Sequence, residues 1–170
     1  WNGRVIAQAA GETDDQARAN ASRTGYYLKK FLTDGLNLTQ GQTAQHNWVA
    51  YRFAEVLLNY AEAVNEAWGP SMVPSGFPGS ATQALQAVRD RASVSLPAVD
   101  AGTVDSFRNA VKHERQVELA FEDHRYWDLL RWKDAMTVLN SPVQGVKISR
   151  SGGAYTYKVV DVADRTFGAR

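Results

Sequence analysis

The chain has 170 residues, of which 44% are hydrophobic and 22% are charged, as in an ordinary globular protein. Its 19 Lys and Arg residues against 18 acidic residues leave a net charge of +1, so nucleic acid and anionic membranes are not expected as partners. The lack of cysteine excludes disulfides, thiolate nucleophiles, iron–sulfur clusters and Cys-ligated zinc. The length and the five Trp, seven Tyr and six Phe predict a single domain over residues 1–170.

The first 46 residues are mostly small and polar, which predicts loops, with one short strand through Tyr26 to Phe31. From Asn47 to Trp68 the apolar residues recur every three or four positions, which predicts an amphipathic helix. A further apolar row widens the apolar arc, so we expect this helix to pack on two sides. Gly69 and Pro70 are expected to end it.

A loop rich in Pro and Gly follows over residues 69–79, and a second helix is expected directly after it. Ser80 and Gln83 have the spacing of a capping box, in which each side chain satisfies a backbone N–H of the first turn. Residues 93–102 are predicted to be another loop, because Pro97 and Gly102 interrupt any regular pattern.

Residues 104–136 are predicted to be helical, with Glu114 and Glu118 inside the apolar stripe. A carboxylate in an apolar face needs a partner, because an uncompensated buried charge is very costly. We therefore expect a structural network of ion pairs between helices. Its members are expected to be Arg89, Arg91, Glu114, Arg115, Glu118, Arg125, Asp128 and Arg131.

The C-terminal stretch changes to alternating polar and apolar residues on either side of Ser151-Gly152-Gly153. This pattern predicts a β-hairpin with strands over residues 146–150 and 155–159. The expected fold is therefore mainly α, with three to four packed helices, extended loops and a small C-terminal β-hairpin.

Four kinds of catalytic or binding site receive little support from the sequence. Glu114 and Glu118 are spaced like the paired carboxylates of a retaining glycosidase, but they point from one helical face and are surrounded by arginines. The three histidines lack metal-binding spacing, so no metal and no cofactor are expected. No phosphate-binding glycine motif and no serine-hydrolase motif occur either.

The tryptophans suggest where a ligand could bind. Trp48, Trp127 and Trp132 lie on or at the ends of predicted helices, where we expect them to pack in the core. Trp68 closes a helix and Phe77 sits in the loop after it, so these two rings are the candidate ligand-binding residues. A flat aromatic ring can lie against the C–H face of a sugar.

The residues also resemble a known family. The stretches Tyr51–Ala63, Val88–Ala92 and Glu114–Lys133 resemble, in order, three motifs of the SusD/RagB family, and Thr24–Phe31 resembles the segment before them. The resemblance covers residues 24–134 and implies an outer-membrane glycan-binding lipoprotein of Bacteroidetes with tetratricopeptide-like helices. It implies no catalysis, and we carry no ligand residue over from it.

Members of that family are longer, and they begin with a signal peptide and a lipidated cysteine that this sequence lacks. The expectation is therefore a C-terminal fragment of such a protein. The resemblance implies a parent on the cell-surface side of the outer membrane, held there only through a lipid anchor outside this chain. It would pass oligosaccharides to a TonB-dependent transporter of the SusC type.

A second interpretation is a structural role, in which these helices dock the rest of the protein or the transporter without touching sugar. The apolar width of the helix over residues 47–68 favours it. The identity of the cargo stays open, and starch, mucin glycans, host N-glycans, plant polysaccharides and peptides are all candidates.

Overall fold

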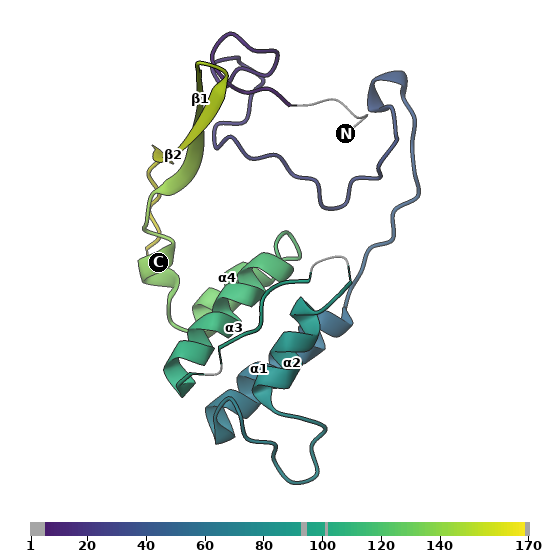
Figure 1. Ribbon diagram of the computed structural model, residues 1–170, viewed down its shortest axis with the longest axis vertical. Helices are drawn as coiled ribbons and strands as arrows, with labels where there is room; N and C mark the ends of the chain where they lie inside the picture. The colour runs from purple at the N-terminus through teal and green to yellow at the C-terminus, as the bar shows by residue number, and fades with distance from the viewer. Residues whose placement is uncertain (1–5, 93–94, 101, 169–170) are drawn as a thin grey trace. The chain divides into compact units, whose positions relative to one another are not determined.

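The computed structural model describes residues 6–92, 95–100 and 102–168. The chain divides into two compact units, one made of residues 48–128 and one made of residues 1–47 with 129–170. We call them the helical unit and the terminal unit. The mainly helical fold with a C-terminal hairpin is confirmed, with five α-helices among the described residues (Figure 1).

The first helix of the helical unit, α1, spans Phe53–Trp68 and begins later than predicted. Arg52 is extended, with φ −125° and ψ 148°, and directly precedes the helix. Gly69 follows the last residue with φ 85°, a conformation that suits glycine and ends the helix as the sequence indicates.

Helix α2 spans Ala81–Arg89, and its predicted capping box is confirmed. The backbone N–H of Gln83 donates to Ser80 Oγ at 3.2 Å, and the N–H of Ser80 donates to Gln83 Oε1 at 2.8 Å. These two bonds satisfy donors that the helix itself leaves unpaired. The predicted loop over residues 93–102 is described only at 95–100 and 102, where it has no regular structure.

The predicted helical stretch 104–136 forms three helices instead of one. They are α3 over Val104–Glu118, α4 over His124–Arg131 and the short α5 over Ala135–Val138. Between α3 and α4, Phe121 and Asp123 each have a φ of 62°, which a right-handed helix does not allow. The chain therefore makes a tight turn at residues 119–123.

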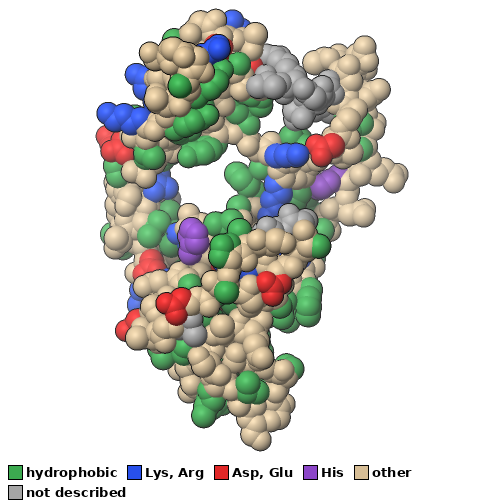
Figure 2. Space-filling model, viewed as in Figure 1, with side chains coloured by type: hydrophobic (Ala, Val, Ile, Leu, Met, Phe, Trp, Pro, Cys, Tyr) green, Lys and Arg blue, Asp and Glu red, His purple; other side chains and the backbone are tan. Residues whose placement is uncertain are grey.

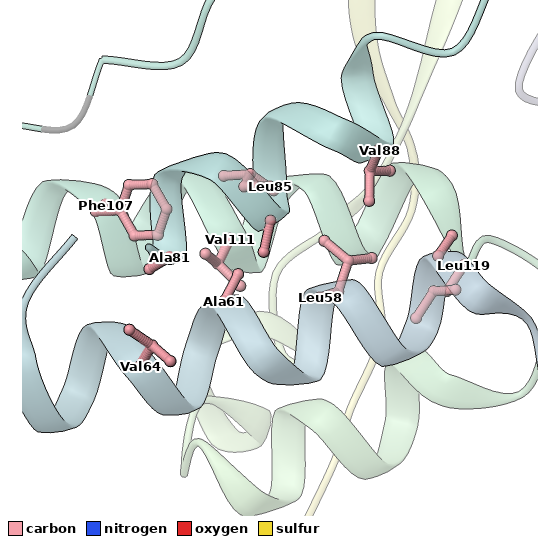
Figure 3. Close-up of a cluster of buried hydrophobic side chains, with 11 residues drawn as sticks. Leu58, Ala61, Val64, Ala81, Leu85, Val88, Phe107, Val111 and Leu119 are labelled. Atoms are coloured by element: carbon pink, nitrogen blue, oxygen red, sulfur yellow. The ribbon is translucent and has the colours of Figure 1, made fainter. Parts of the chain in front are cut away.

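One hydrophobic core joins α1, α2 and α3. Leu58 and Ala61 on α1 face Leu85 on α2 and Val111 on α3, and Leu119 closes the cluster at the end of α3 (Figure 3). Phe107, Leu58 and Ala61 are completely buried. Burial of a Leu or Phe side chain contributes roughly 1.5–3 kcal/mol to the free energy of unfolding.

The terminal unit contains the predicted hairpin, in which β1 over Val143–Ser151 pairs with β2 over Ala154–Ala163. The two-residue turn Gly152-Gly153 has positive φ at both positions, as a hairpin turn that matches strand twist requires. The N-terminal segment lies along β1, because Val146 donates its N–H to the carbonyl of Thr24 at 2.8 Å. A Cβ at Gly145 would lie 2.7 Å from the Cα of Thr24, so only glycine fits this approach.

Two predictions from the sequence are wrong. Residues 26–31 form no strand, and Phe31 has a φ of 68°. Trp48 and Trp127 are not core residues either, since 84% and 66% of their surfaces are exposed. Trp48 lies outside α1 because the helix begins later than its apolar pattern, and Trp127 lies on the outer face of α4.

Among the described residues, no helix is both long and apolar enough to cross a membrane.

Candidate functional site

The two predicted ligand residues lie together at the end of α1. The ring centroids of Trp68 and Phe77 are 5.7 Å apart, and the planes are inclined by 49°. About half of each side chain is exposed, 47% for Trp68 and 46% for Phe77. The loop after α1 therefore places a pair of aromatic rings at the surface of the helical unit.

Tyr60, which the sequence analysis did not single out, holds this pair in place. Its ring lies 6.2 Å from that of Phe77, and its hydroxyl donates to the carbonyl of Gly79 at 2.6 Å. Tyr60 lies two helical turns before Trp68 on α1, so the two rings share a face of the helix. This spacing could have identified Tyr60 from the sequence. The anchored loop limits the freedom that the rings would lose on binding a ligand.

The start of the same loop is also fixed, because the carbonyl of Pro70 accepts from the Thr82 N–H at 2.9 Å and from Thr82 Oγ1 at 2.8 Å. In the described part of the chain, hollows lie at residues 31–46, 13–27 and 119–127. Trp68 and Phe77, each about half exposed, form an open platform, a shape that suits the face of an extended polymer. We call these two residues with Tyr60 the aromatic platform.

The two glutamates of α3 each meet an arginine from the region of α2. Arg89 Nη1 lies 2.5 Å from Glu114 Oε2, and Arg91 Nη2 lies 2.6 Å from Glu118 Oε2. Both carboxylates are therefore compensated by guanidinium groups of a neighbouring element. This arrangement joins helices, whereas a glycosidase needs an acid and a nucleophile on either side of a bond.

Arg115 forms the most deeply buried ion pair described in the helical unit. It donates to both carboxylate oxygens of Asp128, at 2.9 and 3.0 Å, and to Asn59 Oδ1 at 2.5 Å. The two charged side chains are 4% and 6% exposed. Two-point pairing of this kind satisfies the charges and fixes α4 against α1 and α3.

The network also includes residues that the sequence analysis missed. Arg52 bonds Glu118 Oε1 and Glu122 Oε2, both at 2.8 Å, and the carbonyl of Glu118 at 2.9 Å. The hydrogen bond that Arg52 donates to Glu122 is the main cause that raises the pKa of Arg52 above its ordinary value, and the bond to Glu118 adds to it. Arg108 likewise binds both oxygens of Glu66 at 2.6 Å.

The structure also places the last two predicted network members. Arg125 is in the wall of the hollow at residues 119–127, and Arg131 lies 4.7 Å from the ring centroid of Trp132. His124 Nε2 is 3.6 Å from Glu55 Oε2. In the part of the chain that the structure describes, no group of three or more His, Asp or Glu residues is placed to hold a metal ion.

The sequence model of the SusD family matches residues 4–165. Two SusD-like proteins of Formosa agariphila, P38 and P25, are 31% identical over 114 residues and 38% identical over 88 residues. These matches cover 61% and 51% of this chain, but only 20% and 15% of the relatives.

Two solved structures from Bacteroides fragilis are also similar. A SusD-like protein superposes with a TM-score of 0.70 at 28% identity, over 91% of this chain and 28% of that protein. A protein described as a SusD-like carbohydrate-binding protein superposes with a TM-score of 0.64 at 31% identity, over 87% of this chain and 30% of that protein. The chain therefore spans less than a third of its relatives' length.

Proposed function

Because the chain belongs to the SusD family, we propose that it is part of a non-catalytic protein that binds oligosaccharides at the bacterial cell surface. The carbohydrate-binding proteins of this family are non-catalytic, and one similar solved structure is described as carbohydrate-binding. The observation that carries the proposal in this chain is the pair of half-exposed rings, Trp68 and Phe77, held by Tyr60. A pyranose ring would lie on this platform.

The proposal includes delivery of the glycan to a TonB-dependent transporter of the SusC type in the outer membrane. The family resemblance supports this partner and the cell-surface location, with attachment through a lipid anchor outside this chain. Two features of the chain agree with a role in binding alone. Glu114 and Arg115 of α3 and Asp128 of α4 are used in ion pairs between helices, and the net charge of +1 offers no attraction to nucleic acid.

Trp68→Ala and Phe77→Ala test the proposal. The chain is titrated by calorimetry against α-glucan, β-glucan, xylan, mucin-type and chitin oligosaccharides. For the glycan that binds, each substitution should weaken affinity about tenfold, because stacking on an aromatic ring contributes roughly 1–1.5 kcal/mol. Both positions are half exposed, so the melting temperature should change little.

Trp48→Ala is the matched control, because Trp48 is an exposed tryptophan of the same unit outside the aromatic platform. This variant should bind the glycan as the unchanged chain does. Equal loss of affinity in all three variants would contradict a site at the platform. A folded chain that binds no glycan of the panel would contradict glycan binding by this chain.

A second candidate function is docking of another helix, and one observation favours it. The outer face of α1 carries an apolar stripe with alternating spacings of three and four residues. Its members are Phe53, Val56, Tyr60, Ala63 and Ala67. Phe53 is 75% exposed and Val56 is 54% exposed. Hydrophobic side chains are visible at the surface of the lower, helical part of Figure 2.

This spacing is that of a seam between packed helices, and the small Ala63 and Ala67 would allow close approach of a partner backbone. The occupant under this interpretation is a helix from the longer parent protein, since the chain spans only 20% of the relative P38. Such a role requires no contact with sugar.

The double variant Phe53→Ser with Val56→Ser tests the docking function. The unchanged chain should bind a hydrophobic dye or self-associate, because an exposed apolar stripe is unfavourable in water. The double variant should lose most of this signal without a loss of stability, since both side chains are already exposed. A monomeric unchanged chain that binds no dye would count against docking.

A further inference from the structure

A hollow of about 580 Å³ lies at the turn between α3 and α4, within the helical unit. We call it the turn hollow. Its walls come from one short stretch of chain that runs from the core residue directly after α3 to the first turn of α4. They are formed by Leu119, Phe121, Asp123, Arg125, Tyr126 and Trp127.

Three aromatic rings gather at this hollow and remain largely exposed. Phe121 is 69% exposed, Trp127 is 66% exposed and Tyr126 is 47% exposed. Tyr126 and Trp127 form an edge-to-face pair with centroids 5.4 Å apart and planes at 75°. The hollow therefore offers a wall of aromatic surface with the carboxylate of Asp123 beside it.

The backbone at Phe121 is in a conformation that its side chain disfavours. A φ of 62° at a residue with a large side chain is a genuine outlier, and glycine or asparagine would tolerate it better. Phe121 gains little from burial in return, because most of its surface faces solvent. A strained residue with an exposed ring is costly for the fold alone, and such residues cluster at binding sites.

The turn is held from outside by ion pairs. Arg52 bonds both Glu118, before the turn, and Glu122, between the two residues with positive φ. Glu118 is also bonded by Arg91 at 2.6 Å. This fixation keeps the strained conformation and places the rings before any ligand arrives, which lowers the entropy cost of binding.

We propose that the turn hollow is a second glycan subsite, in which a pyranose ring lies against Trp127 and Phe121 while Asp123 accepts hydrogen bonds from its hydroxyls. This inference rests on the proposed glycan-binding function and adds a position to it. An oligosaccharide fits better than an apolar helix, because its hydroxyls can donate to the carboxylate of Asp123 beside the aromatic surface, and an apolar side chain cannot.

Indole N–H signals in a ¹⁵N NMR spectrum test the subsite directly, because each tryptophan gives one signal that a substitution identifies. The probes are maltoheptaose, cellohexaose, xylohexaose and chitohexaose. One of them should shift the Trp127 signal, and Trp127→Ala should weaken its binding about tenfold. Phe121→Asn should weaken binding as well, while its melting temperature stays the same or rises, because asparagine tolerates the positive φ.

Tyr157→Ala is the control, an equally exposed aromatic residue on the hairpin, and it should bind as the unchanged chain does. A shift confined to the Trp68 signal would overturn the subsite and leave the proposed function in place. A shift of Trp127 without Trp68 would support the subsite and contradict the aromatic platform. Unchanged spectra with every probe would overturn both, and full affinity in Phe121→Asn would overturn the role of that ring.

Discussion

Arg115 shows how a single buried charge can organise several helices. It lies on α3, and its guanidinium reaches Asn59 on α1 and Asp128 on α4. Only 4% of each charged residue is exposed, so neither charge can be rehydrated once its partner is lost. At such a position the penalty for an unpaired charge outweighs the net value of the pair itself.

Arg115→Met should therefore lower the free energy of unfolding by about 3–5 kcal/mol, as measured by urea denaturation. The double variant Arg115→Met with Asp128→Leu should recover a large part of this loss, because it also removes the buried carboxylate that loses both hydrogen bonds from Arg115. Arg108→Met is the matched control at an exposed pair, where the expected loss is about 0–1 kcal/mol. Equal losses at the two arginines would contradict the assigned role of burial.

At the scale of elements, the hairpin is tied to the N-terminal segment through Glu12. Tyr155 on β2 donates its hydroxyl proton to Glu12 Oε1 at 2.8 Å, and Arg150 on β1 lies 3.2 Å from the same oxygen. The hydrogen bond from Tyr155 is the main cause that lowers the pKa of Glu12, with the Ala9 N–H second. The same bond raises the pKa of Tyr155 above its ordinary value.

These pKa shifts define the pH range in which the contact between Glu12 and Tyr155 stabilises the fold. The lowered pKa of Glu12 stabilises the fold above the ordinary glutamate value of 4.5, and this contribution is lost as pH falls through the folded pKa. The raised pKa of Tyr155 stabilises the fold below pH 10.0, and that contribution is lost as pH rises through the folded pKa. Both contributions to stability are therefore fully present between about pH 4.5 and pH 10.

Glu12→Gln should lower the pKa of Tyr155 toward its ordinary value, because the carboxylate that favours the protonated phenol is gone. An absorbance titration of the phenol measures this change, with Tyr155→Phe identifying the signal. Glu66→Gln, which removes an acidic group of the helical unit, is the control and should leave the titration of Tyr155 unchanged. An identical titration of Tyr155 in the unchanged chain and in Glu12→Gln would contradict this contact between Tyr155 and Glu12.

The ends of the elements show where prediction from sequence succeeds and where it stops. Ser80 and Gln83 determine the start of α2 locally, so the capping box was predictable from four residues. The turn between α3 and α4 could not be predicted, because residues 104–136 contain no Gly or Pro to mark the end of a helix. Its conformation depends on Arg52, which lies 66 positions before its partner Glu118.

The candidate site shows the same division. Trp68 and Phe77 could be singled out because a helix end and a Pro/Gly loop bring them close in sequence. The exposure of Trp48 and Trp127 could not be predicted. An apolar pattern shows which residues share a face of a helix, but it does not show whether another element covers that face. The strained Phe121 likewise has no sequence signal of its own.

At the scale of the whole molecule, the two units are assembled differently from the chain. The helical unit is one continuous stretch, whereas the terminal unit combines the first 47 residues with the last 42, residues 129–170. Its contacts are therefore distant in sequence. Gln16 Nε2 bonds the carbonyl of Val146 across 130 positions, and Tyr155 bonds Glu12 across 143.

The different sequence separations of the contacts predict an order of folding for the two units. Contacts between such distant residues must overcome the entropy of closing a long loop, while those within α1, α2 and α3 form over much shorter separations. A folded helical unit shortens the flexible chain between the two ends and makes their meeting less costly. We therefore expect the terminal unit to form last and to open first, so that proteolysis and thermal unfolding begin there.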